Sequence, residues 1–375
     1  MKYLKLILLT LLVNSILIAD GIYTSLTQKT DTINKEAVKK LNNAITLKAL
    51  QRKEEFSAQR VMVAVMDISN EKHAGDLIAT YDSDVINEKY KGGSIAAYTY
   101  EPGAVLMPFT YALALKNNIT SEWKLENGFQ GEYHIDSKVI TDEHKFDYIA
   151  SEMIVPVSSN VCMADLSQKL HGNDMYQTLI SFGFTDPSTF FIGYESSGYI
   201  RKATMHDHAI YKATASYGYG IGVNLYQLLQ AYSVFDNDGV KIQPRAILNE
   251  KIYEINEPDL WHEPERVLDS ELAQRMKKIL IKTVKKGTGQ NADMVGLEIG
   301  GKTGTAHMIR DDLYVNNYNS TFVGFVNGKK HKYIIGVIVV NPIKPYHSSE
   351  TAAPLFKDIV AILLDQNYLS HSHHQ

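Results

Sequence analysis

Three short stretches of the chain carry side chains that could bind or react with a ligand. Residues 302–305 read Lys-Thr-Gly-Thr and follow two glycines in a predicted strand, where missing side chains let a ligand approach the backbone closely. Ser158 and Asn160 interrupt a helical segment and would present a hydroxyl and an amide in a loop. The third stretch, residues 101–107, opens a long apolar segment. An ammonium group, hydroxyls and an amide together suit hydrogen bonding to a polar ligand.

The apolar segment that contains the third stretch spans residues 100–116 and carries no charge between its second residue and its last. It is longer than most strands, so it predicts a helix that is apolar on all sides and buried within a domain. Pro108 would fall in the first turn, where a missing N–H costs little. Ala104 and Met107 are three residues apart and would share one face of this helix.

Two other patterns could be taken for ligand sites. Residues 218–222 read Gly-Tyr-Gly-Ile-Gly, but no strand–loop–helix unit with a following lysine accompanies them, so we do not expect a phosphate loop. His206 and His208 are two residues apart and have no evident third partner, so we expect a solvated loop rather than a metal site. The sequence therefore predicts neither a metal site nor a cofactor.

The composition is that of a globular protein. The 375 residues are 45% apolar, enough for one large domain or two modest ones. A formal net charge of −4 offers no basic surface for nucleic acid, which we exclude as a partner. Cys162 is the only cysteine, so an internal disulfide and a cysteine zinc site are both excluded.

The N-terminus has the pattern of an export signal. A short basic start precedes an apolar run from Leu6 to Ala19, which is short for a bilayer span of about 20 residues. We expect residues 1–19 to be a cleaved signal peptide, with an uncleaved membrane anchor as the alternative, and residues 20–31 to be a linker. Either form would place the rest of the chain outside the cytoplasm, in the periplasm or at the outer face of the bacterial inner membrane.

The remaining elements are predicted from hydrophobic periodicity. A hairpin is expected at the apolar runs near 60–69 and 77–81, followed by a loop at 84–98, and short irregular pieces are expected at 117–145. Further strands are expected at 297–302, 320–326 and 332–340. Helices are expected at 32–56, 153–170 with a break at 156–160, 217–235 after its glycines, 270–285 and 353–364.

In order and spacing, the three stretches resemble the transpeptidase domain of penicillin-binding proteins, particularly the class B cell-wall transpeptidases. That family carries the motifs S-x-x-K, S-x-N and K-T-G, with the first serine as the acylated nucleophile. Residues 158–160 read Ser-Ser-Asn and residues 302–304 read Lys-Thr-Gly. Other blocks also look like the family: Val-Ala-Val-Met-Asp at 63–67, Tyr-Glu-Pro-Gly at 100–103, Tyr-Gly-Tyr-Gly-Ile at 217–221, Gly-Thr-Gly at 287–289, Thr-Phe-Val-Gly-Phe at 321–325 and Ala-Ala-Pro-Leu-Phe at 352–356.

The resemblance covers residues 32–366, which we expect to form one transpeptidase-like domain followed by a disordered tail at 367–375. It implies an α/β (α+β) fold, in which an antiparallel sheet flanked by helices stands beside a mostly helical subdomain. The ligand cleft would lie between these two parts.

The chain departs from the family at the first motif. Ala104 stands where the family has serine, and Met107 stands where it has lysine. Nucleophilic catalysis needs an attacking atom and an adjacent base, and both are missing here. Losing the serine alone would leave a buried lysine without a partner, whereas two apolar replacements of similar shape can be nearly neutral in stability. We therefore expect a stable fold in which the first motif has lost its nucleophile and its base.

The other two motifs keep their polar side chains. By resemblance, residues 302–305 would hold the carboxylate of a peptidoglycan stem peptide or a β-lactam, and a cation with hydroxyl donors suits a carboxylate. The backbone N–H groups of Ala104 and Thr305 would form the oxyanion hole, which can survive a change of side chain. Ser158 and Asn160 would belong to the proton-relay motif. The expected substrate-binding residues are Lys302, Thr303, Gly304 and Thr305.

Two functional hypotheses follow from this pattern. In the first, the chain is a catalytically inactive relative that binds peptidoglycan peptides non-covalently or regulates true cell-wall synthases. In the second, it is an active D,D-transpeptidase or carboxypeptidase that uses an unrecognised nucleophile. Labelling with a fluorescent penicillin would discriminate between them, because Ala104 has no oxygen to acylate.

Overall fold

The computed structural model describes most of the predicted domain. The predicted signal segment at residues 1–19, the predicted linker at residues 20–31 and His206 lie outside the described residues. Within the described part, no helix has the length and apolar character needed to cross a membrane. The residues described are 35–69, 74–84, 95–185, 195–201, 208–245, 264–311 and 313–371.

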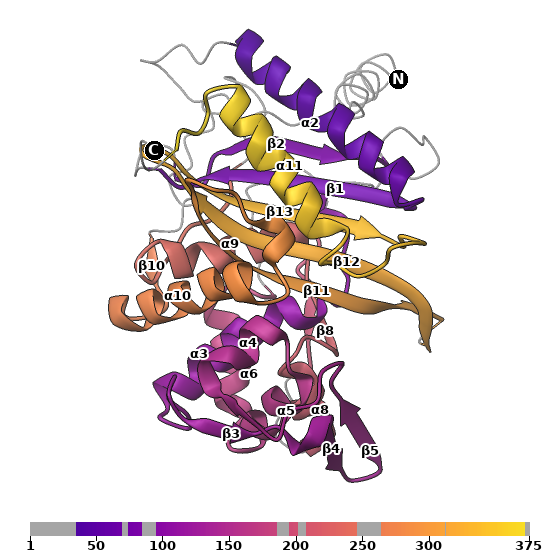
Figure 1. The fold of residues 1–375 in the computed structure, drawn as a ribbon, viewed down its shortest axis with the longest axis vertical. Helices are drawn as coiled ribbons and strands as arrows, with labels where there is room; N and C mark the ends of the chain where they lie inside the picture. The colour runs from indigo at the N-terminus through magenta and orange to yellow at the C-terminus, as the bar shows by residue number, and fades with distance from the viewer. Residues whose placement is uncertain are drawn as a thin grey trace, which may run out of the picture.

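A five-stranded antiparallel sheet forms the centre of the larger part of the molecule (Figure 1). The hairpin predicted near residue 60 is present, and β1 also pairs with β13, which comes from the C-terminal part of the chain. Because β1 lies near the start of the domain and β13 near its end, this pairing joins two segments that are far apart in the sequence. In spatial order the strands are β11 (Glu298–Arg310), β12 (Leu313–Asn327), β13 (Lys332–Val340), β1 (Arg60–Asp67) and β2 (Leu77–Asp82).

Each face of the sheet is covered by a pair of helices, so β1 is buried on both sides. Val61, Val63 and Val65 point into the core beneath α2 (Lys35–Glu55) and α11 (Ala352–Asp365). The alternate residues, including Met62, belong to the core beneath α9 (Leu225–Asp236) and α10 (Ser270–Lys286). Alternating burial of this kind follows from the two-residue period of a strand.

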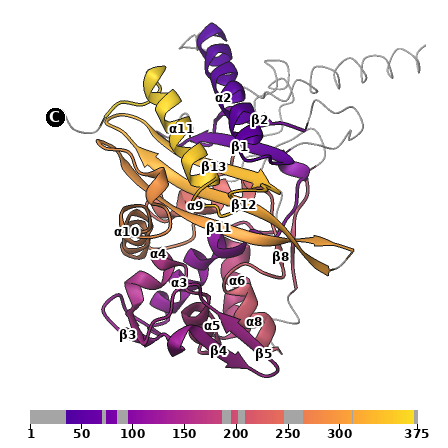
Figure 2. The same cartoon turned by 45° about the vertical axis from the view of Figure 1, so that its right-hand side comes forward.

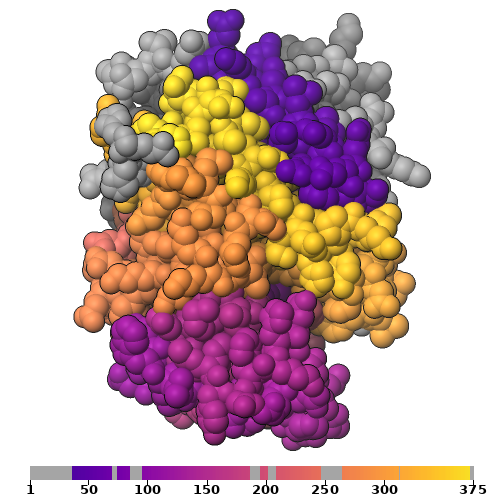
Figure 3. Space-filling model, in the orientation of Figure 1, coloured from indigo at the N-terminus to yellow at the C-terminus, as the bar shows by residue number. Residues whose placement is uncertain are grey.

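A mostly helical subdomain forms a separate lobe beside the sheet (Figures 1 and 3). At its centre, α3 (Met107–Lys116) is buried along nearly its whole length and follows the 3₁₀ turn η2 (Gly103–Leu106). The predicted apolar helix is therefore present, with a 3₁₀ opening. Around it lie α4 (Ile154–Val157), α5 (Asn160–Gln168), α6 (Gly172–Ser181) and α8 (Ala209–Ala215).

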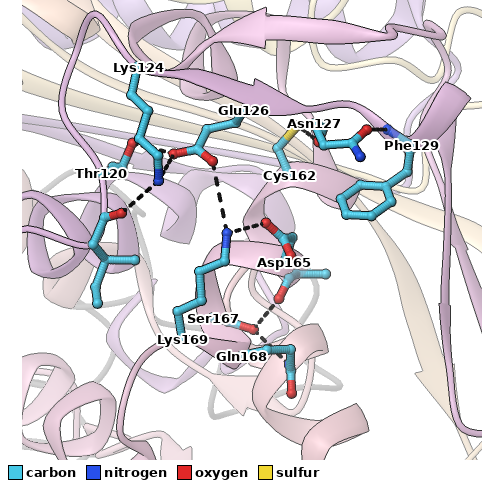
Figure 4. A network of polar contacts seen from close by, with 12 residues as sticks. Thr120, Lys124, Glu126, Asn127, Phe129, Cys162, Asp165, Ser167, Gln168 and Lys169 are labelled. Atoms are coloured by element: carbon cyan, nitrogen blue, oxygen red, sulfur yellow. Dashed lines mark hydrogen bonds and ion pairs between the residues drawn. The ribbon is translucent and has the colours of Figure 1, made fainter.

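Short two-stranded sheets complete the subdomain and its connections (Figure 2). One of them contains a buried carboxylate, Glu126, which accepts a hydrogen bond from Thr120 and pairs with Lys124 and Lys169 (Figure 4). The pair with Lys169 connects this strand to the C-terminal end of α5. The short pairs are β3 (Leu125–Asn127) with β6 (Tyr148–Ala150), β4 (Glu132–Ile135) with β5 (Lys138–Thr141), β7 (Tyr199–Ile200) with β8 (Ile221–Gly222), and β9 (Val240–Lys241) with β10 (Glu265–Arg266).

The antiparallel sheet with flanking helices and a helical subdomain confirms the predicted α+β fold class. One prediction about the chain end is corrected where the structure describes it. Leu369, placed in the expected disordered tail, is only 3% exposed, and the carbonyl oxygen of Ser370 accepts a hydrogen bond from Lys329 N–H. Residues 367–371 are therefore ordered, because an apolar side chain and backbone hydrogen bonds attach them to the sheet.

Candidate functional site

A cavity of about 580 Å³ is lined by the edge strand β11, by η2 and by the helical subdomain. This volume is within the range of small-molecule sites. All three stretches singled out in the sequence contribute to its wall. The lining residues are Ala104, Thr141, Asp142, Glu143, His144, Phe146, Val157, Ser158, Asn160, Tyr217, Tyr219, Thr288, Thr303, Thr305, His307, Tyr318, Tyr346, His347, Ser348 and Ser349.

Two glycines with positive φ position the start of η2 in this wall. Gly103 has a φ of 62°, and its N–H donates to the carbonyl oxygen of Gly218 at 3.2 Å. Gly218 has a φ of 89°, and a Cβ atom there would lie 2.0 Å from the Gly103 oxygen. Only glycine permits this approach. The glycines at 218–222 therefore have a packing role.

The buried carboxylate of Glu101 holds the same region together. It accepts hydrogen bonds from Gly220 N–H and from the Tyr314 hydroxyl, each at 2.8 Å, and from the Tyr199 hydroxyl at 3.3 Å. Burial raises the pKa of the Glu101 carboxyl, and these hydrogen bonds oppose the rise. Glu101 thus links the glycine segment and β12 to the backbone that precedes η2.

The first motif places an alanine in the cavity wall and a methionine behind it. Ala104 lines the cavity, whereas Met107 is fully buried. The Met107 sulfur lies 3.9 Å from Ser158 Oγ, so the first and second motifs are in contact. A methyl group and a thioether offer neither a nucleophilic oxygen nor a base. The usual family chemistry cannot start from these two side chains.

Ser158 occupies the predicted break between two helices. It ends α4 in the left-handed conformation, with φ 63° and ψ 44°, and lines the cavity. The next residue, Ser159, caps α5 by accepting a hydrogen bond from Cys162 N–H at 3.0 Å. Asp142 accepts from the Ser159 hydroxyl and from Val161 N–H, and burial raises the pKa of its carboxyl. Ser158 is therefore held at a fixed corner of the cavity.

Lys302 extends from β11 to Ser158 and is completely buried. Its Nζ atom lies 2.9 Å from Ser158 Oγ, 3.0 Å from the Thr303 carbonyl oxygen and 3.5 Å from Thr303 Oγ1. Within the described ranges no carboxylate contacts this amine. Burial lowers the pKa of Lys302 to about 7, because a charged form without a counterion is poorly solvated there.

The two threonines of the third motif are held by residues outside it. Thr303 Oγ1 shares a hydrogen bond with Thr288 Oγ1. Thr305 Oγ1 donates to Ser348 Oγ at 2.9 Å and accepts from Ser348 N–H at the same distance. All four residues line the cavity, and their hydroxyls form two hydrogen-bonded pairs.

Of the remaining predicted site residues, some line the cavity and one packs behind its wall. Asn160 lines the cavity with Ser158. Gly304 is not among the lining residues; a Cβ atom there would lie 2.5 Å from the Pro102 oxygen, so its place is in the close packing of β11 against η2. The oxyanion hole at the N–H groups of Ala104 and Thr305 stays a prediction, although both residues line the cavity.

Several lining residues were not among the predicted site residues. Thr288 belongs to the Gly-Thr-Gly block at 287–289 that resembled the family, but its contact with Thr303 could not be read from that block. Ser348 lies in a loop without a recognised motif. His307 and Tyr318 pack their rings together in the wall, with ring centroids 4.7 Å apart. The sequence offers no periodic signal for such loop and edge positions.

Similarity to known proteins agrees with this geometry. The chain is 29% identical over 268 residues to the probable peptidoglycan D,D-transpeptidase PbpC of Pseudomonas aeruginosa, which covers 70% of this chain and 45% of that protein. It is 27% identical over 268 residues to the probable peptidoglycan D,D-transpeptidase PenA of Neisseria flavescens, covering 70% of this chain and 63% of that protein. The chain thus spans about half the length of these relatives.

Among solved structures, the apo transpeptidase domain of penicillin-binding protein 3 from Burkholderia pseudomallei has a TM-score of 0.76 at 23% identity. The alignment covers 90% of this chain and 97% of that one, which shows the shared fold. The family model described as the penicillin binding protein transpeptidase domain matches residues 61–361, a range that includes the cavity and all three motif positions. The resemblance seen in the sequence is therefore confirmed: the chain belongs to the penicillin-binding protein transpeptidase domain family.

Proposed function

We propose that this chain is a non-catalytic member of its family that binds peptidoglycan stem peptides without cross-linking them. One observation supports the proposal: Ala104 and Met107 stand in the sequence where the family motif has its serine and lysine. Ala104 lines the cavity, and the Met107 sulfur lies 3.9 Å from Ser158 Oγ. A methyl group cannot be acylated, and a thioether cannot accept the proton of a hydroxyl at neutral pH. This supports a site that keeps its cavity and lacks the reacting atoms of the first motif.

The rest of the cavity supports ligand binding. Thr303 and Thr305 line the cavity with their hydroxyl side chains, and the buried amine of Lys302, which is not among the lining residues, lies behind them. This set of groups suits the terminal carboxylate of a stem peptide or the carboxylate of a β-lactam. The predicted oxyanion hole uses backbone N–H groups, which do not depend on the side chain at position 104. Binding and catalysis are separable, because only interactions stronger in the transition state accelerate a reaction.

The competing function is an active D,D-transpeptidase or carboxypeptidase that cross-links or trims stem peptides through another nucleophile. One experiment separates the two. Purified protein is incubated with a soluble stem peptide that ends in D-Ala-D-Ala, and both binding, by calorimetry, and release of D-alanine are measured. We expect saturable binding without D-alanine release. Catalytic release above that of a boiled sample contradicts the proposal, and absence of binding contradicts the retained ligand site.

We further propose that the chain works outside the cytoplasm beside active cell-wall synthases. The basis is the predicted export segment at residues 1–19. The test is a fusion after Thr30 to a phosphatase that is active only after export. We expect an active fusion, and an inactive fusion that is nevertheless synthesised at full length counts against export.

A further inference from the structure

Four polar side chains meet where α9, α10, β11 and β12 come together (Figure 1). Asp236 is the last residue of α9, and Lys277 lies within α10. Glu298 and Asn327 are paired residues at the adjoining ends of β11 and β12. None of the four lines the cavity, so this cluster is separate from the motif site and has no part in the proposed function.

Lys277 lies between two carboxylates. Its Nζ atom is 2.8 Å from Asp236 Oδ1 and 2.6 Å from Glu298 Oε1. The centroid of the Phe325 ring is 5.4 Å from the same atom, so the amine also faces apolar surface. The Asp236 side chain is fully buried, whereas that of Lys277 is 22% exposed. The amine is thus held in contact with a carboxyl group from which water is excluded.

The side-chain amide of Asn327 links the two carboxylates. Its Nδ2 atom donates to Asp236 Oδ1 at 2.8 Å and to Glu298 Oε1 at 2.9 Å. The other carboxyl oxygen, Asp236 Oδ2, is buried and accepts no hydrogen bond from the described residues. The two oxygens of Asp236 are therefore unequal. Negative charge is stabilised on Oδ1, which two donors contact, and Oδ2 is the oxygen that the cluster does not hold.

Burial favours the uncharged forms of the Asp236–Lys277 pair. It raises the pKa of the Asp236 carboxyl, although the contacts with Lys277 and Asn327 oppose the rise. Burial also lowers the pKa of Lys277, but attraction to Asp236 and Glu298 outweighs this effect and raises it. The amine is therefore mostly protonated. Transfer of one proton across the 2.8 Å contact gives an amine beside a carboxylic acid, which is a minor but reactive form of the pair.

We propose that Lys277 and Asp236 condense to an amide, a covalent cross-link between α9 and α10, with Glu298 as the proton carrier. An ion pair that is removed from water is costly to keep, and an amide in its place carries no charge. Two groups held in contact react as if at effective concentrations of up to about 10⁵–10⁸ M, which favours a condensation that water opposes for separate molecules. Because the reactive form is a minority, we expect the bond to form slowly after folding.

The bonds in this reaction balance without a further reactant. A proton passes from Lys277 Nζ to the carboxyl group of Asp236, and the lone pair of the amine then attacks Asp236 Cγ. Oδ1 takes the negative charge beside the Asn327 amide. Glu298 accepts a second proton from Nζ and returns it to the departing oxygen, Oδ2, which leaves as water. The product has lost one water, and Glu298 ends unchanged.

The experiment follows the intact mass of the full chain, denatured at intervals over several days after folding. Peptide mapping identifies the N-terminus, so that the expected mass can be calculated from the sequence. We expect the mass to fall by one water, and mapping should give a branched peptide that joins the segment of Asp236 to the segment of Lys277. Retention of the full mass overturns the proposal, and so does a loss of water located elsewhere in the chain.

Asp238 and Gly239 offer a different route to the same loss of mass, because an aspartate that precedes glycine can cyclise to a succinimide. Hydroxylamine cleaves the chain at a succinimide and leaves a side-chain amide intact. We expect the protein that has lost one water to resist hydroxylamine. Cleavage after Asp238 in all of this protein would mean that the water came from the succinimide, which overturns the proposal.

Two variants test the parts of Lys277 and Glu298. Lys277→Arg keeps a cation between the carboxylates but has no amine to condense, so its mass should stay complete. Glu298→Gln keeps a hydrogen-bonding side chain and removes the proton carrier, so it should slow the bond about 100-fold or more, the usual contribution of a general base. Circular dichroism verifies that both variants are folded. Loss of one water from folded Lys277→Arg overturns the proposal, and an unchanged rate in folded Glu298→Gln contradicts the part given to Glu298.

A second ion pair of α10 provides the matched control. Lys285 Nζ lies 2.7 Å from Asp293 Oδ1, but the two side chains are 44% and 32% exposed. Water therefore reaches this pair, and we expect it to give no branched peptide. Lys285→Arg should lose one water at the wild-type rate. Cross-links at both pairs would show that contact alone is sufficient, which contradicts the role given to the burial of Asp236 and to Glu298.

Discussion

The sulfur atom of Met107 lies 3.9 Å from the hydroxyl oxygen of Ser158, so the first two motifs of the family still meet in this chain. The contact explains why the two departures occur together. A lysine at position 107 without a serine at position 104 would be buried near Lys302 without an acidic partner, which is costly. Methionine fills a similar volume with no charge. The two changes together remove the hydroxyl and the amine of the first motif without leaving a buried charge unpaired at position 107.

Restoring both side chains should restore acylation at the first motif. We expect the double variant Ala104→Ser with Met107→Lys to gain a penicillin adduct on position 104. The serine would lie in the cavity wall, and the lysine would reach Ser158 from the place of the present sulfur. Peptide mapping after labelling distinguishes this adduct from any at Ser158.

The single variants are the controls for this repair. Ala104→Ser alone has no adjacent base, and Met107→Lys alone has no nucleophile at position 104 to activate. Met107→Lys should also lower the melting temperature, because it buries a second cation near Lys302. If the double variant folds and binds a stem peptide but never labels at position 104, the cavity has changed beyond these two residues.

The long apolar and alternating segments made most of the fold predictable. The strands near 60–69, 77–81 and 332–340 are close to β1, β2 and β13, since their burial pattern is visible in the sequence. The end of β11 was not predicted, because His307–Arg310 are polar or half exposed and remain a strand through pairing with β12. The helix α6 was also missed: it is short, begins with glycine, and buries Met175 and Leu179 only through tertiary packing.

The sequence indicated many of the residues that belong to the site, but fewer of the contacts that they make. The motif pattern indicated that Ser158 and Lys302 lie together, and their atoms are 2.9 Å apart. Nothing in the sequence shows that no carboxylate of the described residues contacts Lys302, because its surroundings come from several separate segments. The attachment of Thr305 to Ser348 depends on how a loop folds back over β11, which has no local sequence signal.

Exchange of Lys302 for methionine should stabilise the fold at neutral pH. Burial lowers the pKa of Lys302 from 10.5 to about 7, and none of the described carboxylates contacts the amine. Below pH 7 both the folded and the unfolded chain bind this proton, so the whole cost of burying the charge is present. We expect Lys302→Met to raise the free energy of unfolding at pH 6.5 by roughly 1–4 kcal/mol, the range seen when buried ionic groups are replaced by apolar ones.

The pH dependence provides the check on this prediction. Between about pH 7 and 10.5 the unfolded wild-type chain holds a proton that the folded chain has lost. The free energy of unfolding of the wild type therefore increases with pH in this range, relative to that of the variant. Denaturant unfolding of both proteins at pH 6.5, 8 and 9.5 should therefore show a shrinking difference. A constant difference would mean that Lys302 titrates normally in the folded state.

The close approach of Gly218 to Gly103 predicts a strong effect of a single methyl group. In Gly218→Ala the new Cβ atom would lie 2.0 Å from the Gly103 oxygen at a φ of 89°. We expect a loss of roughly 2–4 kcal/mol in the free energy of unfolding and weaker stem-peptide binding. Gly289→Ala is the matched control, since its φ is −92° and the nearest atoms are 3.3 Å away. Equal effects of the two variants would refute the packing role of Gly218.

The hydroxyl of Thr305 should bind a ligand carboxylate only by giving up its present partner. It donates its proton to Ser348 Oγ and accepts from Ser348 N–H, so in the ligand-free protein its single donor is already used. Ser348→Ala removes the acceptor and frees the proton for the ligand, while the N–H contact remains. We therefore expect this variant to bind a stem peptide up to about fivefold more tightly, corresponding to about one neutral hydrogen bond. Thr305→Val should instead weaken binding by a similar factor, since it removes the donor. Calorimetric titration of both variants with the same peptide measures the two effects, and a shift in the same direction for both would show that Thr305 does not contact the ligand.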